Sequence, residues 1–161
     1  MDRYLTLDAG CGECFRGDVN VDLYKEASEH RSNTKVELKG IPNFVNCSIE
    51  HLPFKDRAFK HVKSYHAIEH VDKPYLALKE LIRVCDSHLI IKCPHRFSLN
   101  AKAKTHKNQL TRTWFVKALG FFQTYFSGTL YFRTGISRKQ TLFWFIPEEI
   151  TVEVFRGRCT A

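Results

Sequence analysis

The segment Leu7-Asp8-Ala9-Gly10-Cys11-Gly12 decides the fold, because a strand-like run ends there on a pair of glycines. The run Tyr4–Ala9 (YLTLDA) has the composition of a short strand. Glycine permits a tight turn and lets a ligand approach the main chain closely. A second strand-like run, Val19–Leu23, follows, and its Asp22 can accept hydrogen bonds from both hydroxyls of a ribose. Together these features predict a nucleoside-binding site where the two strands end.

Strand-like and helix-like segments alternate along the rest of the chain. Pro74–Cys85 is the clearest helix, with apolar residues near helical spacing and a proline suited to the first turn. His88–Cys93 (HLIIKC) is a continuous apolar run, typical of a strand inside a parallel sheet. Further strands are expected at Asn43–Cys47 and His61–Tyr65, further helices at Glu26–His30 and at Gln109–Leu119 (ended by Gly120), and two or three strands within Phe121–Phe132 and Thr141–Phe155. This alternation predicts an α/β fold with a parallel sheet.

The connection between the first two strands is too short for the usual helix. About nine residues, Gly10–Asp18, join these strands, whereas a parallel crossover usually needs about a dozen or more. One face of the sheet is therefore expected to be thinly covered. Because a parallel sheet needs cover on both faces, we expect a second subunit, in a homodimer, or an unusual loop to lie there.

Four segments, in unbroken order over roughly residues 5–95, resemble class I S-adenosylmethionine-dependent methyltransferases of the small-molecule-type branch. They are LDAGCG, GDVNVDLY, SIEHLPFKDRAFKHVKSYHAIEHV and ALKELIRVCDSHLIIKCPH. The resemblance implies a Rossmann-like three-layer α/β sandwich. Its sheet would be mostly parallel and seven-stranded, in the order 3-2-1-4-5-7-6, with an antiparallel C-terminal strand pair. Residues 1–161 would form a single domain, with a cofactor-binding half (1–93) and a substrate-side half (94–161).

The resemblance also implies roles at the first strand and its loop. Gly10, Cys11 and Gly12 would wrap the methionine end of S-adenosylmethionine, and Asp8 would hold that loop or bind the amino group of the cofactor. Asp22 would bind the ribose. Compared with the family pattern, the chain is trimmed at the N-terminus and after the first strand, and the third glycine of the loop is missing.

Further residues are placed by the resemblance at the adenine and at the reacting methyl group. Leu23 would pack on the adenine. Ser48 and Ile49 stand where the family has an acid and a small apolar residue at the adenine, so one contact to the exocyclic amine would be weaker. His66, just past the fourth strand, would face the methyl-transfer pocket. It is the candidate catalytic residue, because a general base helps when the methyl acceptor carries a proton.

The segment His66-Ala-Ile-Glu-His70 also fits H-x-x-E-H, the pattern of inverted zinc proteases. Histidines four residues apart on a helix share a face and can bind zinc, with Glu148 or Glu149 as a distant third ligand. In the methyltransferase interpretation, Glu69 and His70 instead begin a helix and hold a loop. The sequence thus leaves a remote alternative function, a zinc hydrolase that uses His66, Glu69 and His70.

The net charge of +8 is concentrated in one part of the chain. Residues 87–147 contain 10 Lys and Arg and no acidic residue, whereas residues 1–86 contain 13 Lys and Arg and 14 Asp and Glu. The candidate substrate-side residues are His95, Arg96, Lys102, Lys104 and His106. Such a basic stretch suits an anionic or phosphate-bearing acceptor, nucleic acid included, and it is equally typical of a solvated surface. A non-catalytic nucleic-acid-binding or regulatory protein on a degenerate methyltransferase fold is therefore the main alternative.

Composition argues against other protein classes. No run approaches the roughly 18 apolar residues of a membrane span, and the first ten residues lack the pattern of a signal peptide. The six cysteines are mostly scattered, which indicates reduced thiols rather than a disulfide framework, so we expect a cytoplasmic protein. Cys11 and Cys14 have the spacing of half a zinc site, but no second close pair completes it, and no metal is expected.

Overall fold

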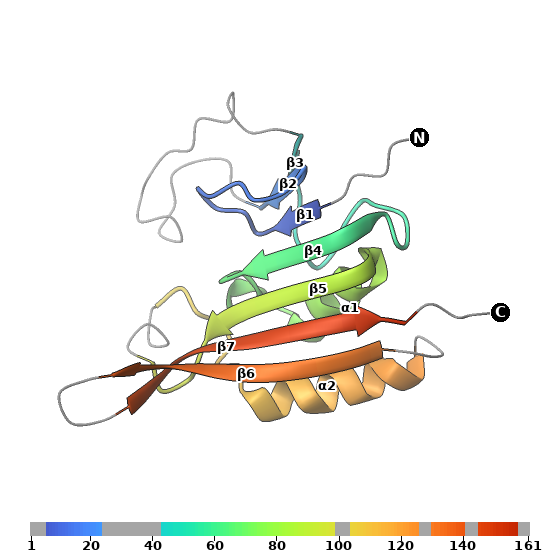
Figure 1. Ribbon diagram of the computed structural model, residues 1–161. Coiled ribbons are helices and arrows are strands. Elements are labelled where there is room, and N and C mark those ends of the chain that lie inside the picture. Colours follow the sequence, from blue (N-terminus) through green and yellow to red (C-terminus); the bar gives the residue numbers. More distant parts are fainter. Residues whose placement is uncertain (1–5, 24–42, 99–103, 126–129, 141–144, 158–161) are drawn as a thin grey trace.

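The computed structural model describes residues 6–23, 43–98, 104–125, 130–140 and 145–157. These residues form one sheet of seven strands in the order β3-β2-β1-β4-β5-β7-β6 (Figure 1). Neighbouring strands run parallel from β3 to β5, and β7 runs antiparallel to both β5 and β6. The predicted fold class and strand order are confirmed. The helix expected at Glu26–His30 lies outside the described residues.

The elements follow the chain in the expected alternation. The strands are β1 (Thr6–Ala9), β2 (Val19–Asp22), β3 (Phe44–Asn46), β4 (Phe59–Tyr65), β5 (Cys85–Pro94), β6 (Leu130–Gln140) and β7 (Phe145–Arg156). The helices are the 3-10 turn η3 (Ile68–His70), α1 (Pro74–Val84) and α2 (Arg112–Tyr125). No helix within the described ranges is long and apolar enough to cross a membrane.

Helix α2 corrects two expectations about the aromatic part of the chain. The helix continues through Gly120, and the first residues of the segment Phe121–Phe132, expected to be a strand, belong to it. Phe115, Leu119 and Phe122 are all buried, which is the i, i+4, i+7 spacing of one helix face. Glycine destabilises a helix by only about 1 kcal/mol relative to alanine, so the burial of Phe122 is enough to continue the helix through Gly120.

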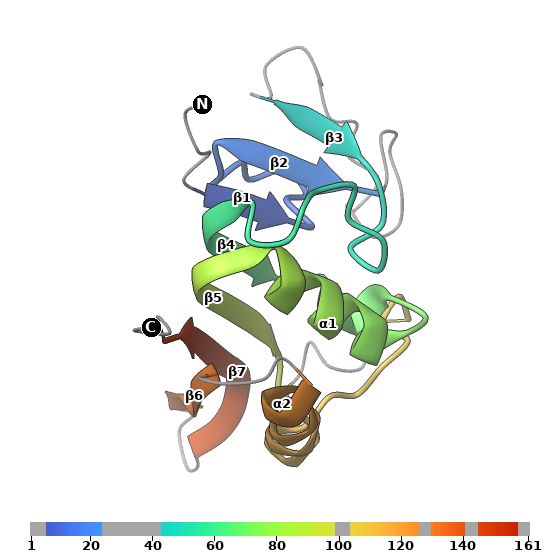
Figure 2. The same cartoon turned by 90° about the vertical axis from the view of Figure 1, so that its right-hand side faces the viewer.

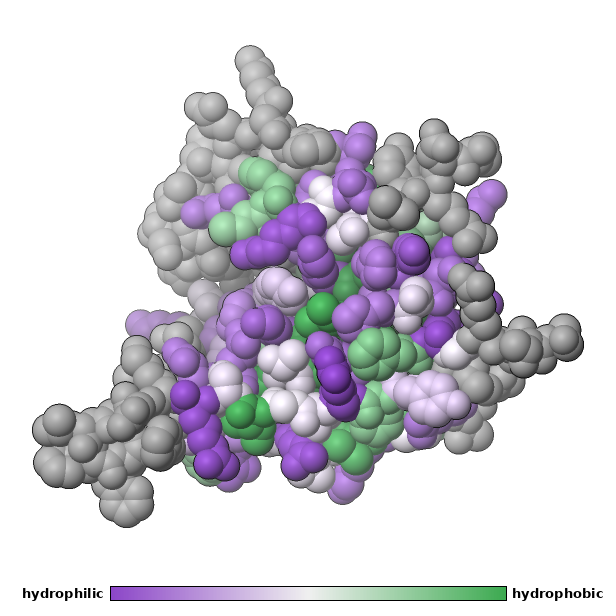
Figure 3. Space-filling model, viewed as in Figure 1, coloured by the Kyte–Doolittle hydropathy of each residue, from purple (hydrophilic) through white to green (hydrophobic). Residues whose placement is uncertain are grey.

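Both α-helices of the described part lie on the same face of the sheet (Figure 2). In β4 and β5, the buried residues Val62 and Leu89 alternate with half-buried polar residues such as Lys63 and Lys92. Successive side chains of a strand point to opposite faces, so the polar set lies on the face away from the helices. Burial alternates along β5, which lies inside the sheet between β4 and β7 and is only half-buried on this second face. Figure 3 shows hydrophilic and hydrophobic side chains mixed over the face away from the helices.

The short β1–β2 connection covers one corner of this second face. The backbone N–H of Arg16 donates to Asp8 Oδ2 (2.9 Å), and its guanidinium lies 5.2 Å from the centre of the Tyr65 ring. Lys63 Nζ donates to the Arg16 carbonyl from the next strand (3.5 Å). Of the two covers expected from the sequence, the unusual loop thus accounts for this corner. A homodimer over the rest of the face stays a prediction.

Candidate functional site

A cleft opens where β1, β2 and β4 end, at the C-terminal edge of the parallel strands. This is the edge where open α/β sheets bind ligands. The described residues that line it are Gly10, Gly12, Asp22, Leu23, Ser48, Ile49, Glu50, His66, Ala67, His70, Val71, Asp72 and Lys107. Seven of the nine residues expected at the cofactor are in this lining, and Asp8 and Cys11 are not.

Two glycines with positive φ shape the floor of the cleft. Gly10 (φ +81°) packs so closely that an added Cβ would lie 2.3 Å from the Ala67 Cβ. Gly12 (φ +55°) has open space where a Cβ would stand, so its backbone is accessible to a ligand. The N–H groups of Gly10 and Cys11 both donate to the Val21 carbonyl, at 2.8 and 2.9 Å. The loop is therefore fixed to β2 rather than freely hinged.

The acidic end of β2 lies on the wall of the cleft. Asp22 is 8% exposed, and its Oδ2 accepts a hydrogen bond from the Gly12 N–H (2.8 Å). This bond couples the glycine loop to the carboxylate that we expect to bind a ribose. Leu23, the next residue, is 53% exposed and offers an apolar surface beside it. Ile49 is buried and also lines the cleft.

Asp8 and Cys11 are buried next to the cleft and do not line it. Asp8 is fully buried, and burial raises the pKa of its carboxyl group, against the opposing effect of the Arg16 N–H and guanidinium. Of the two roles expected for Asp8, its position suits holding the loop. Cys11, between the two glycines of the loop, is 3% exposed.

Several cleft residues were missed by the sequence reasoning. Glu50 lies two residues after Ser48, and its carboxylate accepts hydrogen bonds from the Ser48 hydroxyl (3.2 Å) and the Lys73 N–H. An acid is thus present in this wall, although it is shifted from the position expected from the family pattern. Asp72 and Lys107 form an ion pair of 2.7 Å at another part of the lining. The pair joins residues 35 apart, which no local pattern could reveal.

His66 lies between two carboxylates immediately after β4. Its Nδ1 is 3.6 Å from Glu69 Oε1, and its Nε2 is 3.1 Å from Glu149 Oε2. The neighbouring Glu69 carboxylate raises the pKa of His66, burial opposes this effect, and Glu149 adds to the rise. Lys92 Nζ holds the other oxygen of Glu149 at 3.1 Å. The backbone of His66 has φ +53°, an uncommon value that directs the ring out of the strand.

A second cavity adjoins the cleft at the same histidine. It is lined by His66, Pro94, Ser137, Glu148 and Glu149 in the described part of the chain. His66 thus lines both spaces. The carboxylates of the second cavity outnumber its cationic groups.

The basic substrate-side residues are not gathered at either space. His95 is half-buried, and burial together with Arg96 lowers its pKa. Arg96 is exposed, with its guanidinium 4.4 Å from the centre of the Phe97 ring, and Lys104 is exposed on a loop. Lys102 lies outside the described residues.

The helix required by the inverted zinc-protease pattern does not form. His66 has a left-handed backbone, and only the single turn η3 follows it. The two histidines therefore do not share a helix face. The fifth substrate-side candidate, His106, lies instead against His70, with ring centres 4.7 Å apart.

Comparisons with known proteins agree with this geometry. Residues 3–88 match the family described as "Methyltransferase domain". The search of the curated proteins found no match. Among solved structures, the YcgJ protein from Bacillus subtilis is similar, with TM-score 0.65, 16% identity, and coverage of 97% of this chain and 93% of that one.

Two further structures contain S-adenosylhomocysteine (SAH). The plantazolicin methyltransferase BpumL, in complex with a substrate analogue and SAH, has TM-score 0.64 at 13% identity, and 96% and 77% of the two chains are covered. The magnesium protoporphyrin IX methyltransferase ChlM from Synechocystis PCC 6803, with bound SAH, has TM-score 0.59 at 16% identity, and 96% and 74% are covered. These likenesses support the fold, and the matched family covers more than half of the sequence. The chain belongs to the methyltransferase-domain family of class I S-adenosylmethionine-dependent methyltransferases.

Proposed function

We propose that the protein is an active S-adenosylmethionine-dependent methyltransferase that binds its cofactor in the cleft. The observation that carries the proposal is the coupling of Gly12 to Asp22. Gly12 offers an accessible backbone, and the carboxylate bonded to its N–H lies on the same wall. Gly10 and Gly12 would hold the methionine end, and Asp22 would hold the ribose. When bound, S-adenosylmethionine supplies an electrophilic methyl group.

The adenine end suits the apolar part of the lining. Leu23 is exposed and lines the cleft, and Ile49 is a buried apolar residue of the same lining. A flat base can pack against such side chains, since ligand sites are mostly apolar with a few placed polar groups. Ser48 and Glu50 provide those polar groups, and their mutual hydrogen bond orients them.

His66 is the proposed catalytic residue, because it lines both the cleft and the second cavity. An acceptor in the second cavity would present its hydroxyl or amine between the two spaces. His66 would accept the proton that the acceptor loses, and Glu149 would hold the imidazole ring, as the carboxylate does in other His–acid pairs. Lys92 in turn fixes Glu149.

The electrostatics of the second cavity favour a neutral or cationic reacting group on the acceptor. Glu148 and Glu149 are in its lining, and the described basic residues of the segment 95–117 are not. An anionic reacting group would meet like charge there. The expected anionic or phosphate-bearing acceptor therefore suits this cavity only if its phosphate lies away from the reacting end.

Isothermal titration calorimetry with S-adenosylmethionine and SAH tests the proposal directly. We expect both to bind, and we expect Asp22→Ala to abolish binding. Asp18→Ala is a matched control, because Asp18 lies at the opposite end of β2, where it accepts the Thr6 N–H. Absence of binding to the unaltered protein would exclude the methyltransferase function. Equal loss in both variants would mean that Asp22 acts through stability alone.

A second function, binding of single-stranded nucleic acid, is favoured by the uncovered sheet face. Lys63, Lys92 and Arg133 lie on that face with Tyr131, which is 62% exposed, and Phe155. Lys92 and Arg133 also pair with glutamates. Cations among aromatic rings suit a phosphate backbone with stacking bases. Gel retardation of a single-stranded oligonucleotide should weaken steeply as salt rises. No retardation at low salt would exclude this function.

A further inference from the structure

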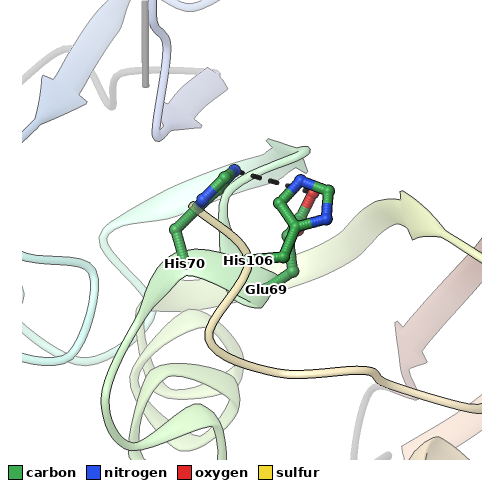
Figure 4. Close-up of side chains that lie close together, drawn as sticks. All are labelled: Glu69, His70 and His106. Atoms are coloured by element: carbon green, nitrogen blue, oxygen red, sulfur yellow. Dashed lines mark ion pairs between the residues drawn. The ribbon is translucent and has the colours of Figure 1, made fainter. Parts of the chain in front are cut away.

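Three potential metal ligands meet beside the cleft (Figure 4). Glu69 and His70 come from η3, and His106 comes from the loop that precedes α2. One ligand atom from each residue lies within 4.8 Å of the other two. In Figure 4 the Glu69 carboxylate lies at the His106 ring, and a dashed line joins it to the His70 ring.

The Glu69 carboxylate is the unusual member of this cluster. Glu69 is 2% exposed, and neither carboxylate oxygen has a hydrogen-bond partner within the described part of the chain. The nearest charged or titratable groups are His66 Nδ1 at 3.6 Å and His70 Nε2 at 4.0 Å. A buried carboxylate without hydrogen bonds is strongly destabilising unless a cation accompanies it.

His70 is oriented as a metal ligand would be. Its Nδ1 lies 2.9 Å from the Thr105 carbonyl oxygen. A carbonyl can only accept, so Nδ1 carries a proton, and in the neutral ring Nε2 then presents its lone pair toward Glu69. Metal-binding histidines commonly donate the other ring N–H to a backbone carbonyl in this way.

The loop that carries His106 is fixed to η3 by its backbone. The N–H groups of Lys107 and Asn108 both donate to the Glu69 carbonyl, each at 3.0 Å. The Asn108 side-chain amide donates to the Val71 carbonyl at 2.6 Å. Together with the contact between His70 Nδ1 and the Thr105 carbonyl, these bonds hold the loop where the His106 ring lies beside that of His70.

We propose that Glu69, His70 and His106 form a binding site for a divalent zinc ion. Two imidazole nitrogens and one carboxylate oxygen are a ligand set that zinc accepts, with water in the fourth position. Zinc ligands at about 2.0–2.1 Å from the ion lie roughly 3.3 Å from one another, so the three side chains must close by up to about 1.5 Å on binding. The ion would join η3 to the loop of Lys107, and both contribute to the lining of the cleft.

Calorimetric titration of the chelator-treated, full-length protein with ZnCl2 tests the proposal without reference to methyl transfer. We expect one ion per chain, with little response to MgCl2. Glu69→Gln and His106→Ala should each weaken zinc binding at least about tenfold. His51→Ala is the matched control, because His51 is exposed and lies outside the cluster. Unchanged affinity in both cluster variants, or no binding to the unaltered protein, would overturn the proposal.

Two additional measurements distinguish zinc held by this cluster from zinc bound elsewhere on the chain. Without zinc, Glu69→Gln should unfold at the same temperature as the unaltered protein or higher, because it removes a buried charge, and added zinc should no longer raise that temperature. Cobalt(II) bound at this site should lack the thiolate charge-transfer band. Such a band would place the ion at a cysteine and would refute the assignment.

Discussion

Replacement of Gly10 by alanine should destabilise the fold strongly, and its cost can be worked out from two observations. The residue has φ +81°, a conformation that costs an alanine about 1–2 kcal/mol. Its added Cβ would lie 2.3 Å from the Ala67 Cβ, far closer than carbon atoms approach in proteins. Forcing a methyl group into a packed core costs about 1–3 kcal/mol. Gly10→Ala should therefore lower the free energy of unfolding by about 2–5 kcal/mol.

Urea unfolding, followed by circular dichroism, measures this loss. The double variant Gly10→Ala/Ala67→Gly removes the Ala67 methyl group that the new Cβ would meet. It should therefore regain the part of the stability lost to the steric clash, while the loss due to the positive φ remains. Gly120→Ala is the control, because Gly120 is helical with no neighbour within 4 Å, and there alanine should stabilise by up to about 1 kcal/mol. A loss below about 1 kcal/mol for Gly10→Ala, or no recovery in the double variant, would refute the argument.

Two further predictions concern helices. Phe122→Ala should lower the free energy of unfolding by about 3–5 kcal/mol, because this side chain is 3% exposed. Phe121→Ala, at a residue that is 64% exposed, should change it by no more than about 0.5 kcal/mol. Chemical denaturation of the two variants tests the helical assignment, and equal losses would contradict it. The hydrogen bond from Arg83 lowers the pKa of Glu80, so the pair stabilises the protein above the unfolded pKa of about 4.3 and this stabilisation disappears as pH falls through the folded value. Glu80→Gln should flatten the acid side of the stability–pH curve measured by thermal unfolding, and an unchanged acid side would contradict the sign.

The positions of the strands could be predicted because each motif that marks a strand is local, whereas their order in the sheet followed from the resemblance to class I methyltransferases. The glycine loop, the carboxylate of Asp22 and the position of His66 each depend on a few adjacent residues and the strand that they follow. The aromatic segment was harder. Phe121 and Phe122 resemble strand residues in composition, whereas the spacing of buried positions from Phe115 onward continues a helix. Periodicity prevailed over composition because burial of Phe122 outweighs the weak intrinsic preference.

Other parts of the site could not be predicted from a local pattern. Lys107 pairs with Asp72 across 35 residues, and the ring of His70 bonds to the Thr105 carbonyl across the same separation. Both contacts arise because the loop before α2 returns over η3, and only the packed fold brings the two segments together. The basic residues show the converse. Their clustering in the sequence suggested a common pocket, but the alternation of β5 and the exposed loops distribute them over separate surfaces.

The β1–β2 connection combines two tasks that the family pattern assigns to a loop and a helix. Its first residues, Gly10 to Gly12, form the floor of the cleft, and Arg16 covers the corner of the second sheet face over Tyr65. Asp8 connects the cleft floor to the cover, because it lies in β1 two residues before Gly10 and its buried carboxylate accepts the Arg16 N–H. A change that releases Arg16 would thus leave a buried carboxylate with less compensation, and the disturbance would reach Gly10 through two residues of chain. The short connection can replace a helix because Asp8 holds both the glycine loop of the cleft and the Arg16 segment that covers the sheet.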